Sequence, residues 1–223
     1  MALMNLDAGE YPDEPEALWA LFDVLNIACG GHAGDAASMA RVVAWCVAHG
    51  AAISAHPSYP DREGFGRRSL AIAPDALAAS LGAQCEALVA LARGHGRDVA
   101  YVKPHGALYH DANARPELAE AVIGAARAVI GDRVIVVGPP GGELARVAAA
   151  HHLGYAVEGF ADRRMRADGS LVPRGEANAL LTDPAQAAAQ ALALAARVAT
   201  ICVHADTPGA LAIAGAVHEA LHG

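Results

Sequence analysis

Histidine and aspartate side chains stand at or just past the ends of several short apolar runs in this 223-residue sequence. Imidazole and carboxylate groups act as general acids and bases, and they also bind divalent metals. A lysine occurs at one of the same boundaries and could stabilise a negative charge. The candidate catalytic residues at these boundaries are Asp7, His32, His56, Lys103, His105 and His204.

If these groups converged, two kinds of site could result. One is a metal site that lowers the pKa of a bound water and polarises a carbonyl. The other is a metal-free site, where a histidine or aspartate takes a proton from water and a lysine or arginine stabilises the oxyanion. The sequence has no HExxH or other close ligand spacing, so both alternatives stay open. The candidate metal ligands are Asp7, His56 and His105.

The apolar runs themselves predict the strands of a parallel sheet. They are continuously apolar rather than alternating, which is typical of strands covered on both faces. The segment after Asp35, a good N-cap, shows helical spacing of apolar residues and ends at Gly50. The runs span residues 3–6, 24–29, 51–55, 99–102, 133–137, 155–160 and 199–203. Prolines expected in first helical turns are Pro74, Pro116, Pro184 and Pro208.

This alternation predicts an α/β fold, a β/α barrel of about seven units that forms a single domain over residues 1–223. An open doubly wound sheet is the alternative, but no GxGxxG follows the first run. Barrels of this kind build active sites beyond the carboxyl ends of their strands. The predicted barrel would therefore bring the candidate residues together at one mouth.

Two arginine-rich stretches, residues 60–68 and 160–174, are predicted to be loops at this mouth. Arginine binds carboxylate and phosphate groups with paired hydrogen bonds, so we expect a small acidic or phosphorylated substrate. A solvated basic loop is the alternative. The candidate substrate-binding residues are Asp35, Arg62, Asp162, Arg163 and Asp206, although Asp35 could equally serve only as a helix cap.

The composition argues against several classes of partner. Lys and Arg number 16 against 24 Asp and Glu, and the net charge of −8 makes a nucleic-acid partner unexpected. The N-terminus does not resemble a signal peptide and no apolar run reaches transmembrane length, so we expect a cytoplasmic protein with no membrane partner. The 4 cysteines form no CxxC pair and are expected to be reduced and buried.

Five segments in series carry a resemblance to a known family. They read NIACGGHAGD, AHPSYPDREGFGRR, VKPHGALY, FADRRMRADGSLVPR and CVHADTPGA. In this order they resemble the LamB/YcsF family, which comprises the A subunits of bacterial ATP-dependent 5-oxoprolinases. The resemblance implies a seven-stranded β/α barrel of the glycoside hydrolase/deacetylase type.

The resemblance also implies a function, the opening of the lactam ring of 5-oxoproline to glutamate. ATP would be a co-substrate whose hydrolysis is coupled through separate B and C partner subunits. We expect those partners to handle the nucleotide, because this chain has no GxxxxGK[ST] loop. For the roles of the residues, we infer that Asp7 or His105 activates water and that His204 protonates the leaving nitrogen. Lys103 and Arg163 would bind anions.

Some positions depart from the family pattern, namely Leu3, Gly31, Met165 and Ala205. The tract before Ala199 is also shorter than is usual in the family. A metal-dependent deacetylase of N-acetylated sugars and a non-catalytic subunit that kept the barrel are therefore retained as alternative functions.

Overall fold

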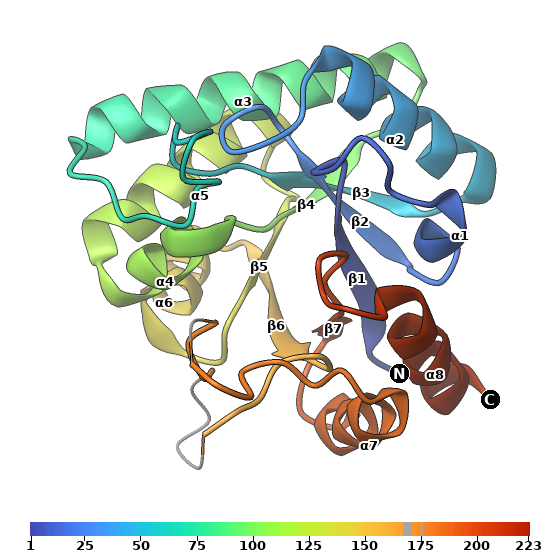
Figure 1. Ribbon diagram of the computed structural model, residues 1–223. Coiled ribbons are helices and arrows are strands. Elements are labelled where there is room, and N and C mark those ends of the chain that lie inside the picture. The colour runs from blue at the N-terminus through green and yellow to red at the C-terminus, as the bar shows by residue number, and fades with distance from the viewer. Residues whose placement is uncertain (167–170, 175) are drawn as a thin grey trace.

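The computed structural model describes residues 1–166, 171–174 and 176–223 (Figure 1). Within them, seven strands close into a barrel in chain order, and β7 completes it by pairing with β1. All neighbouring strands are parallel, so the predicted seven-stranded β/α barrel is confirmed. The strands are β1 (Leu3–Ala8), β2 (Val24–Ala28), β3 (Ala52–His56), β4 (Val99–Val102), β5 (Ile135–Gly138), β6 (Gly154–Phe160) and β7 (Thr200–Cys202).

Helices surround the strands (Figure 1). The predicted helix after Asp35 is confirmed, because the Asp35 side chain accepts a hydrogen bond from the Ser38 N–H and Gly50 ends the helix at a φ of 81°. The described helices are α1 (Glu16–Trp19), α2 (Ala36–His49), α3 (Pro74–Gly94), α4 (Gly106–Ala114), α5 (Pro116–Ile130), α6 (Gly142–Ala150), α7 (Pro184–Ala195) and α8 (Ala210–His222).

Three of the four prolines expected in first helical turns begin a helix, namely Pro74, Pro116 and Pro184. The prediction for Pro208 is wrong. Gly209 is the N-cap of α8 with a φ of 80°, so the proline lies just outside the helix. The reason is a tight turn, in which the Thr207 N–H donates to the His204 carbonyl before the helix starts.

Of the described helices, α3 alone is long and apolar enough to cross a membrane by length and composition. One face of it is buried, including Leu77, Leu81 and Leu88, and the helix packs against α5 and the barrel. The core helix of a soluble protein has the same composition, so α3 is accounted for as part of the outer layer. The four cysteines are free and buried, as predicted.

Polar side chains line the inside of the barrel, although the strands read as apolar runs. The Asn26 side-chain amide donates to Asn5 Oδ1 at 2.8 Å and to Asp7 Oδ1 at 2.9 Å, and Asn5 donates to Thr200 Oγ1 at 2.8 Å. These groups are buried and offset their loss of water by bonding one another. A second cavity of about 280 Å³ lies toward the amino ends of the strands. Asn5 and Thr200 of the polar layer are among the residues that line it.

Two loops at the other end of the barrel are joined through backbone atoms. The Ala107 N–H donates to the Gly66 carbonyl at 2.9 Å, and the His105 N–H donates to the Pro57 carbonyl at 2.9 Å. Gly106 has a φ of 58°, and a Cβ there would lie 2.5 Å from the Gly66 carbonyl oxygen. Glycine is required at this crossing, because any larger residue would separate the two loops.

The glycine loop that presents His32 offers a test of packing. Gly34 and Gly50 have nearly equal φ values, 79° and 81°, but only at Gly34 would a Cβ collide with a backbone atom, the Ala28 carbonyl oxygen. We expect Gly50→Ala to lower the free energy of unfolding by about 1 kcal/mol, the cost of left-handed backbone. Gly34→Ala should cost at least about 2 kcal/mol more. Urea unfolding of both variants checks this, and equal losses would contradict it.

Candidate active site at the barrel mouth

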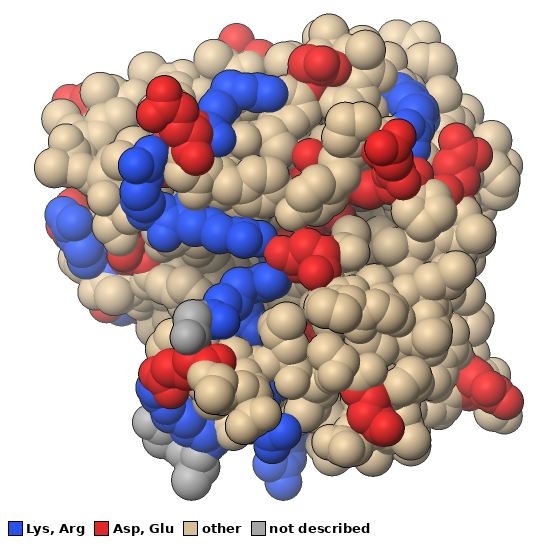
Figure 2. Space-filling model, in the orientation of Figure 1, with Lys and Arg blue, Asp and Glu red and all other residues tan. Residues whose placement is uncertain are grey.

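A cavity of about 450 Å³ opens at the carboxyl ends of the strands. This is where β/α barrels bind their substrates. On the face shown in Figure 2, Lys and Arg side chains border a hollow that has acidic side chains beside it. Of the residues predicted from the sequence, those that line the cavity are Asp7, His56, Lys103, His105, Arg163, His204 and Asp206.

The floor of the cavity is a buried cluster of charges around Lys103. Its ammonium nitrogen lies 2.9 Å from Asp7 Oδ1, 2.8 Å from Glu158 Oε1 and 3.2 Å from Asn5 Oδ1. Burial opposes the charge of Lys103, but Asp7, Cys202 and Glu158 outweigh it and hold the pKa of Lys103 well above its usual value. Lys103 is therefore a fixed cation at neutral pH.

Asp7 is the matching fixed anion. Burial would raise the pKa of Asp7, but His56 and Lys103 outweigh that effect and hold it well below its usual value. Its Oδ1 is engaged by Lys103 and Asn26, while its Oδ2 lies 3.4 Å from His56 Nε2. The carboxylate can therefore accept a further hydrogen bond from a molecule in the cavity.

Asp162 holds His204 in a fixed orientation, and a ring nitrogen of His204 lies within 4.8 Å of an Asp7 carboxylate oxygen. His204 Nδ1 lies 3.0 Å from each Asp162 carboxylate oxygen, and Oδ2 also accepts from the His204 N–H and the Thr207 hydroxyl. Burial raises the pKa of Asp162, but His204 and Thr207 outweigh it and keep that pKa below its usual value. Because Nδ1 faces the Asp162 carboxylate, it carries the ring proton, and Nε2 is left as the nitrogen that can accept one. A histidine oriented in this way by a carboxylate is the arrangement that catalytic triads use for proton transfer.

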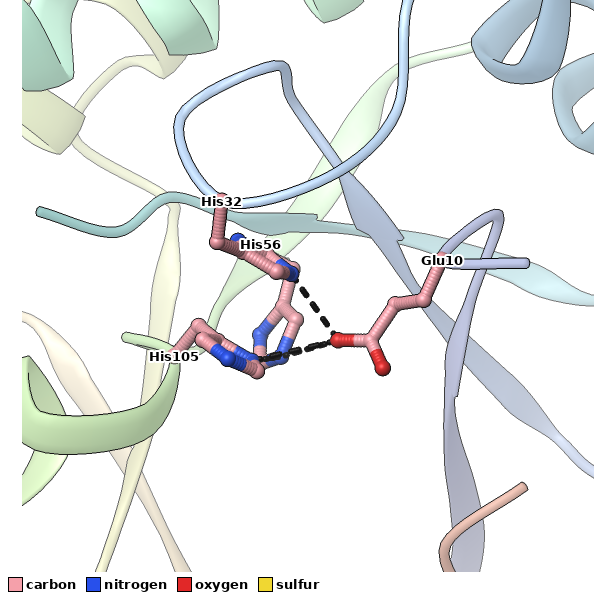
Figure 3. Close-up of side chains that lie close together, drawn as sticks. All are labelled: Glu10, His32, His56 and His105. Carbon is pink, nitrogen blue, oxygen red and sulfur yellow. Dashed lines mark hydrogen bonds and ion pairs between the residues drawn. The ribbon is translucent and has the colours of Figure 1, made fainter. Parts of the chain in front are cut away.

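Glu10 joins three histidines beside this cavity (Figure 3). Its Oε1 lies 2.9 Å from His32 Nε2, 3.1 Å from His105 Nδ1 and 3.7 Å from His56 Nε2. The rings of His32 and His105 stack in parallel with centroids 3.5 Å apart. The sequence prediction did not select Glu10. The only signal was its position three residues after Asp7, in the turn that follows β1.

Burial and mutual contacts shift the pKa values of this cluster in different directions. Burial lowers the pKa of His32 to about 4 and also lowers the pKa of His105. For His56, burial acts in the same direction, but Asp7 outweighs it and the pKa is raised. Burial would raise the pKa of Glu10, yet its contacts with His105 and His32 leave that pKa well below its usual value.

Three residues predicted to bind substrate do not line the cavity, namely Asp35, Arg62 and Asp162, and Asp162 is fully buried behind His204. Asp35 is exposed and caps α2. Arg62 donates to the Gly30 and Gly34 carbonyls at 3.0 and 2.8 Å, so it supports the loop of His32. Asp35 and Arg62 border a separate hollow near α2.

Arg163 and Asp206 do reach the cavity. Arg163 is buried and donates to the Val172 carbonyl at 2.8 Å. Asp206 sits at the rim, where it pairs with Arg67 at 2.7 Å and with Arg174 at 2.9 Å. Residues 167–170 of the predicted arginine-rich loop lie outside the described residues.

Among the described residues, two groups place their ligand atoms within 4.8 Å of one another and could hold a metal. One contains Glu10, His32, His56 and His105, and the other contains Asp7, Cys202 and His204. The predicted ligand set of Asp7, His56 and His105 is thus divided between the two groups.

Comparison with known proteins identifies the family. Residues 4–223 match the LamB/YcsF family. The chain belongs to the LamB/YcsF family. A relative, the 5-oxoprolinase A subunit of Methylococcus capsulatus, is 44% identical over 230 aligned positions, which cover 95% of this chain and 88% of the relative. The crystal structure of the lactam utilization protein from Thermus thermophilus superposes with a TM-score of 0.91 and 33% identity, covering 99% of this LamB/YcsF chain and 95% of that one.

The connection before Ala199, which we expected to be short, leaves the barrel closed. Helix α7 ends at Ala195 and β7 begins at Thr200, so residues 196–199 alone connect them. Strand β7 still pairs with both β6 and β1. The alignment with the Methylococcus relative is longer than the part of this chain it covers, so that relative has residues without a counterpart here.

The charge of Asp162 should contribute measurably to stability. Because its folded-state pKa lies below the ordinary 3.8, its contribution is present above that pH and is lost as the pH falls through the folded-state value. We expect Asp162→Asn to lower the free energy of unfolding by about 2–4 kcal/mol at pH 7, since its amide would face three donors.

Urea unfolding between pH 7 and pH 3 checks this expectation. The difference in the free energy of unfolding between the unmodified chain and Asp162→Asn should become smaller as the pH falls below about 3.8. The matched control is Asp132→Asn, which removes a surface ion pair with Arg127 and should cost less than about 1 kcal/mol at any pH. A loss of unfolding free energy in Asp162→Asn that does not change with pH would contradict the low pKa of Asp162 in the folded state.

Proposed function

We propose that this chain is the A subunit of an ATP-dependent 5-oxoprolinase, which hydrolyses the lactam of 5-oxoproline to glutamate. The observation that carries the proposal is that the Asp162–His204 dyad and the buried Lys103–Asp7 pair adjoin the same cavity in a LamB/YcsF barrel. The names of the Methylococcus relative and the Thermus structure support the choice of a lactam as substrate.

Opening a lactam is an amide hydrolysis with two electrostatic requirements. The tetrahedral intermediate carries an oxyanion that needs donors, and the departing nitrogen needs a proton. Lys103 supplies a fixed positive charge at the floor of the cavity. Arg163 supplies a second one at the wall, where it would bind the substrate's carboxylate or a phosphate on an activated intermediate.

We assign proton transfer to His204. Asp162 fixes the tautomer, so the Nε2 of His204 can take a proton from water and return it to the lactam nitrogen. This assignment extends the role inferred from the sequence, which covered only the second of these transfers.

Asp7 is favoured over His105 as the group that positions the attacking water. His105 has both ring nitrogens engaged, Nε2 by the Phe65 carbonyl at 2.9 Å and Nδ1 by Glu10 and His56. Asp7 keeps one carboxylate oxygen toward the cavity. Its low pKa makes it a weak base, so it orients water while His204 accepts the proton.

ATP enters the proposal through partner subunits. The Methylococcus relative is named as one lettered subunit of its enzyme, which supports a complex with further subunits. We assign nucleotide handling and activation of the lactam to the B and C subunits, because the sequence contains no P-loop. We assign the hydrolysis of the activated lactam to this chain, and we place the chain in the cytoplasm.

Reconstitution tests the function directly. We expect glutamate to form from 5-oxoproline and ATP only when this chain is mixed with B and C subunits from the same source. Amino-acid analysis and ADP release measure the reaction. Failure of this chain in a mixture where another family member restores glutamate release would refute the proposal.

His204→Gln should then separate catalysis from binding. We expect kcat of the reconstituted complex to fall by about 10²–10⁴, the usual contribution of a positioned acid–base group, with KM changed by less than about threefold. The control is His95→Gln, an exposed residue that follows α3 far from the mouth. A kcat of His204→Gln within about threefold of the unmodified chain would rule out this role.

A further inference from the structure

The imidazoles beside Glu10 are arranged so that three ring nitrogens converge on one carboxylate oxygen (Figure 3). Two of the three rings have their other nitrogen against a backbone carbonyl. His105 Nε2 lies 2.9 Å from the Phe65 oxygen, and His56 Nδ1 lies 2.7 Å from the Lys103 oxygen. A carbonyl can only accept a hydrogen bond, so both of these nitrogens carry the proton.

The tautomers fixed in this way leave lone pairs in the centre of the cluster. In a neutral imidazole, a proton on one nitrogen makes the other an acceptor. His105 Nδ1 and His56 Nε2 are therefore two acceptors 3.0 Å apart, and both face the Glu10 carboxylate. A cation at the centre of the cluster would satisfy these two nitrogens and the Glu10 carboxylate together.

The pattern of a central lone pair and an outer N–H on a carbonyl is the one that metal-binding histidines use. The spacing also fits. Two nitrogens that bind one ion at about 2.0–2.1 Å lie about 2.9–3.4 Å apart. The His56 and His105 nitrogens are 3.0 Å apart, Glu10 Oε1 lies 2.9 to 3.7 Å from the three imidazoles, and all four ligand atoms lie within 4.8 Å of one another. His32 adds a third imidazole, which stacks on His105.

We propose that Glu10, His32, His56 and His105 bind one divalent first-row transition-metal ion. Imidazole nitrogens with one carboxylate favour zinc and its neighbours over calcium or magnesium, which prefer oxygen ligands. Glu10, His56 and His105 also line the 450 Å³ cavity, so the ion would border the space where substrate binds. When bound, such an ion lowers the pKa of water and polarises a carbonyl.

The competing group of Asp7, Cys202 and His204 is the weaker candidate. Asp7 Oδ1 is already neutralised by Lys103, and the pKa of Cys202 is raised well above its usual value by burial, so the thiol stays protonated. His204 is engaged by Asp162 on one side. The two groups can be distinguished, because substitutions in one group should weaken metal binding and substitutions in the other should not.

Metal titration of the full chain tests the proposal. The chain is stripped with a chelator, titrated with Zn²⁺ in a calorimeter and analysed for metal content. We expect one Zn²⁺ per chain, and visible absorption bands when Co²⁺ replaces it. Glu10→Gln and His105→Gln should weaken Zn²⁺ binding about 100-fold or more, whereas His204→Gln should bind like the unmodified chain. Circular dichroism establishes whether each variant is folded. If His105→Gln does not fold, Glu10→Gln alone tests the site.

Several results would overturn the site. They are the absence of stoichiometric Zn²⁺ in the unmodified chain, unchanged binding in Glu10→Gln, and loss of binding in folded His204→Gln. The proposal does not rest on the lactam chemistry, and the two can fail separately. Glutamate release by a metal-free complex would leave the proposed function standing, while one bound Zn²⁺ with no glutamate release would leave the metal site standing.

Discussion

The ammonium of Lys103 is the interaction on which the barrel mouth depends. It lies inside the ring of strands and contacts carboxylates carried by β1 and β6, on different walls of the barrel. A buried charge without a partner is strongly destabilising, so this contact holds Asp7 and Glu158 at fixed positions. The negative charge of Asp7 in turn raises the pKa of His56, which links the barrel floor to the histidine cluster.

Most of the framework could be predicted because its signals are local. Continuous apolar runs and the cap at Asp35 depend on neighbours in sequence, and the strands and α2 were found where these signals stood. Parallel strands in a barrel share one direction, so the residues that follow them must converge. That argument alone placed Asp7, Lys103 and His204 around one cavity.

The remainder of the site depends on contacts between distant segments. Glu10 occupies a turn with no periodic signal, and only the approach of loops from β2, β3 and β4 reveals its partners. Glu158 lies within an apolar run and gives no sign of pairing with Lys103. Arg62 shows how a long side chain can be drawn elsewhere, because its guanidinium donates to the Gly30 and Gly34 carbonyls and does not line the mouth cavity.

The polar layer inside the barrel also divides its interior into two compartments. Asn5 and Thr200 face the lower cavity, Asp7 and Lys103 face the mouth, and hydrogen bonds between the two sets close the space between them. In the part of the chain that the structure describes, this layer thus lies between the mouth cavity and the lower cavity. Because the mouth cavity opens at the carboxyl ends of the strands, a protein docked over those ends would cover the site where reactant enters and product leaves.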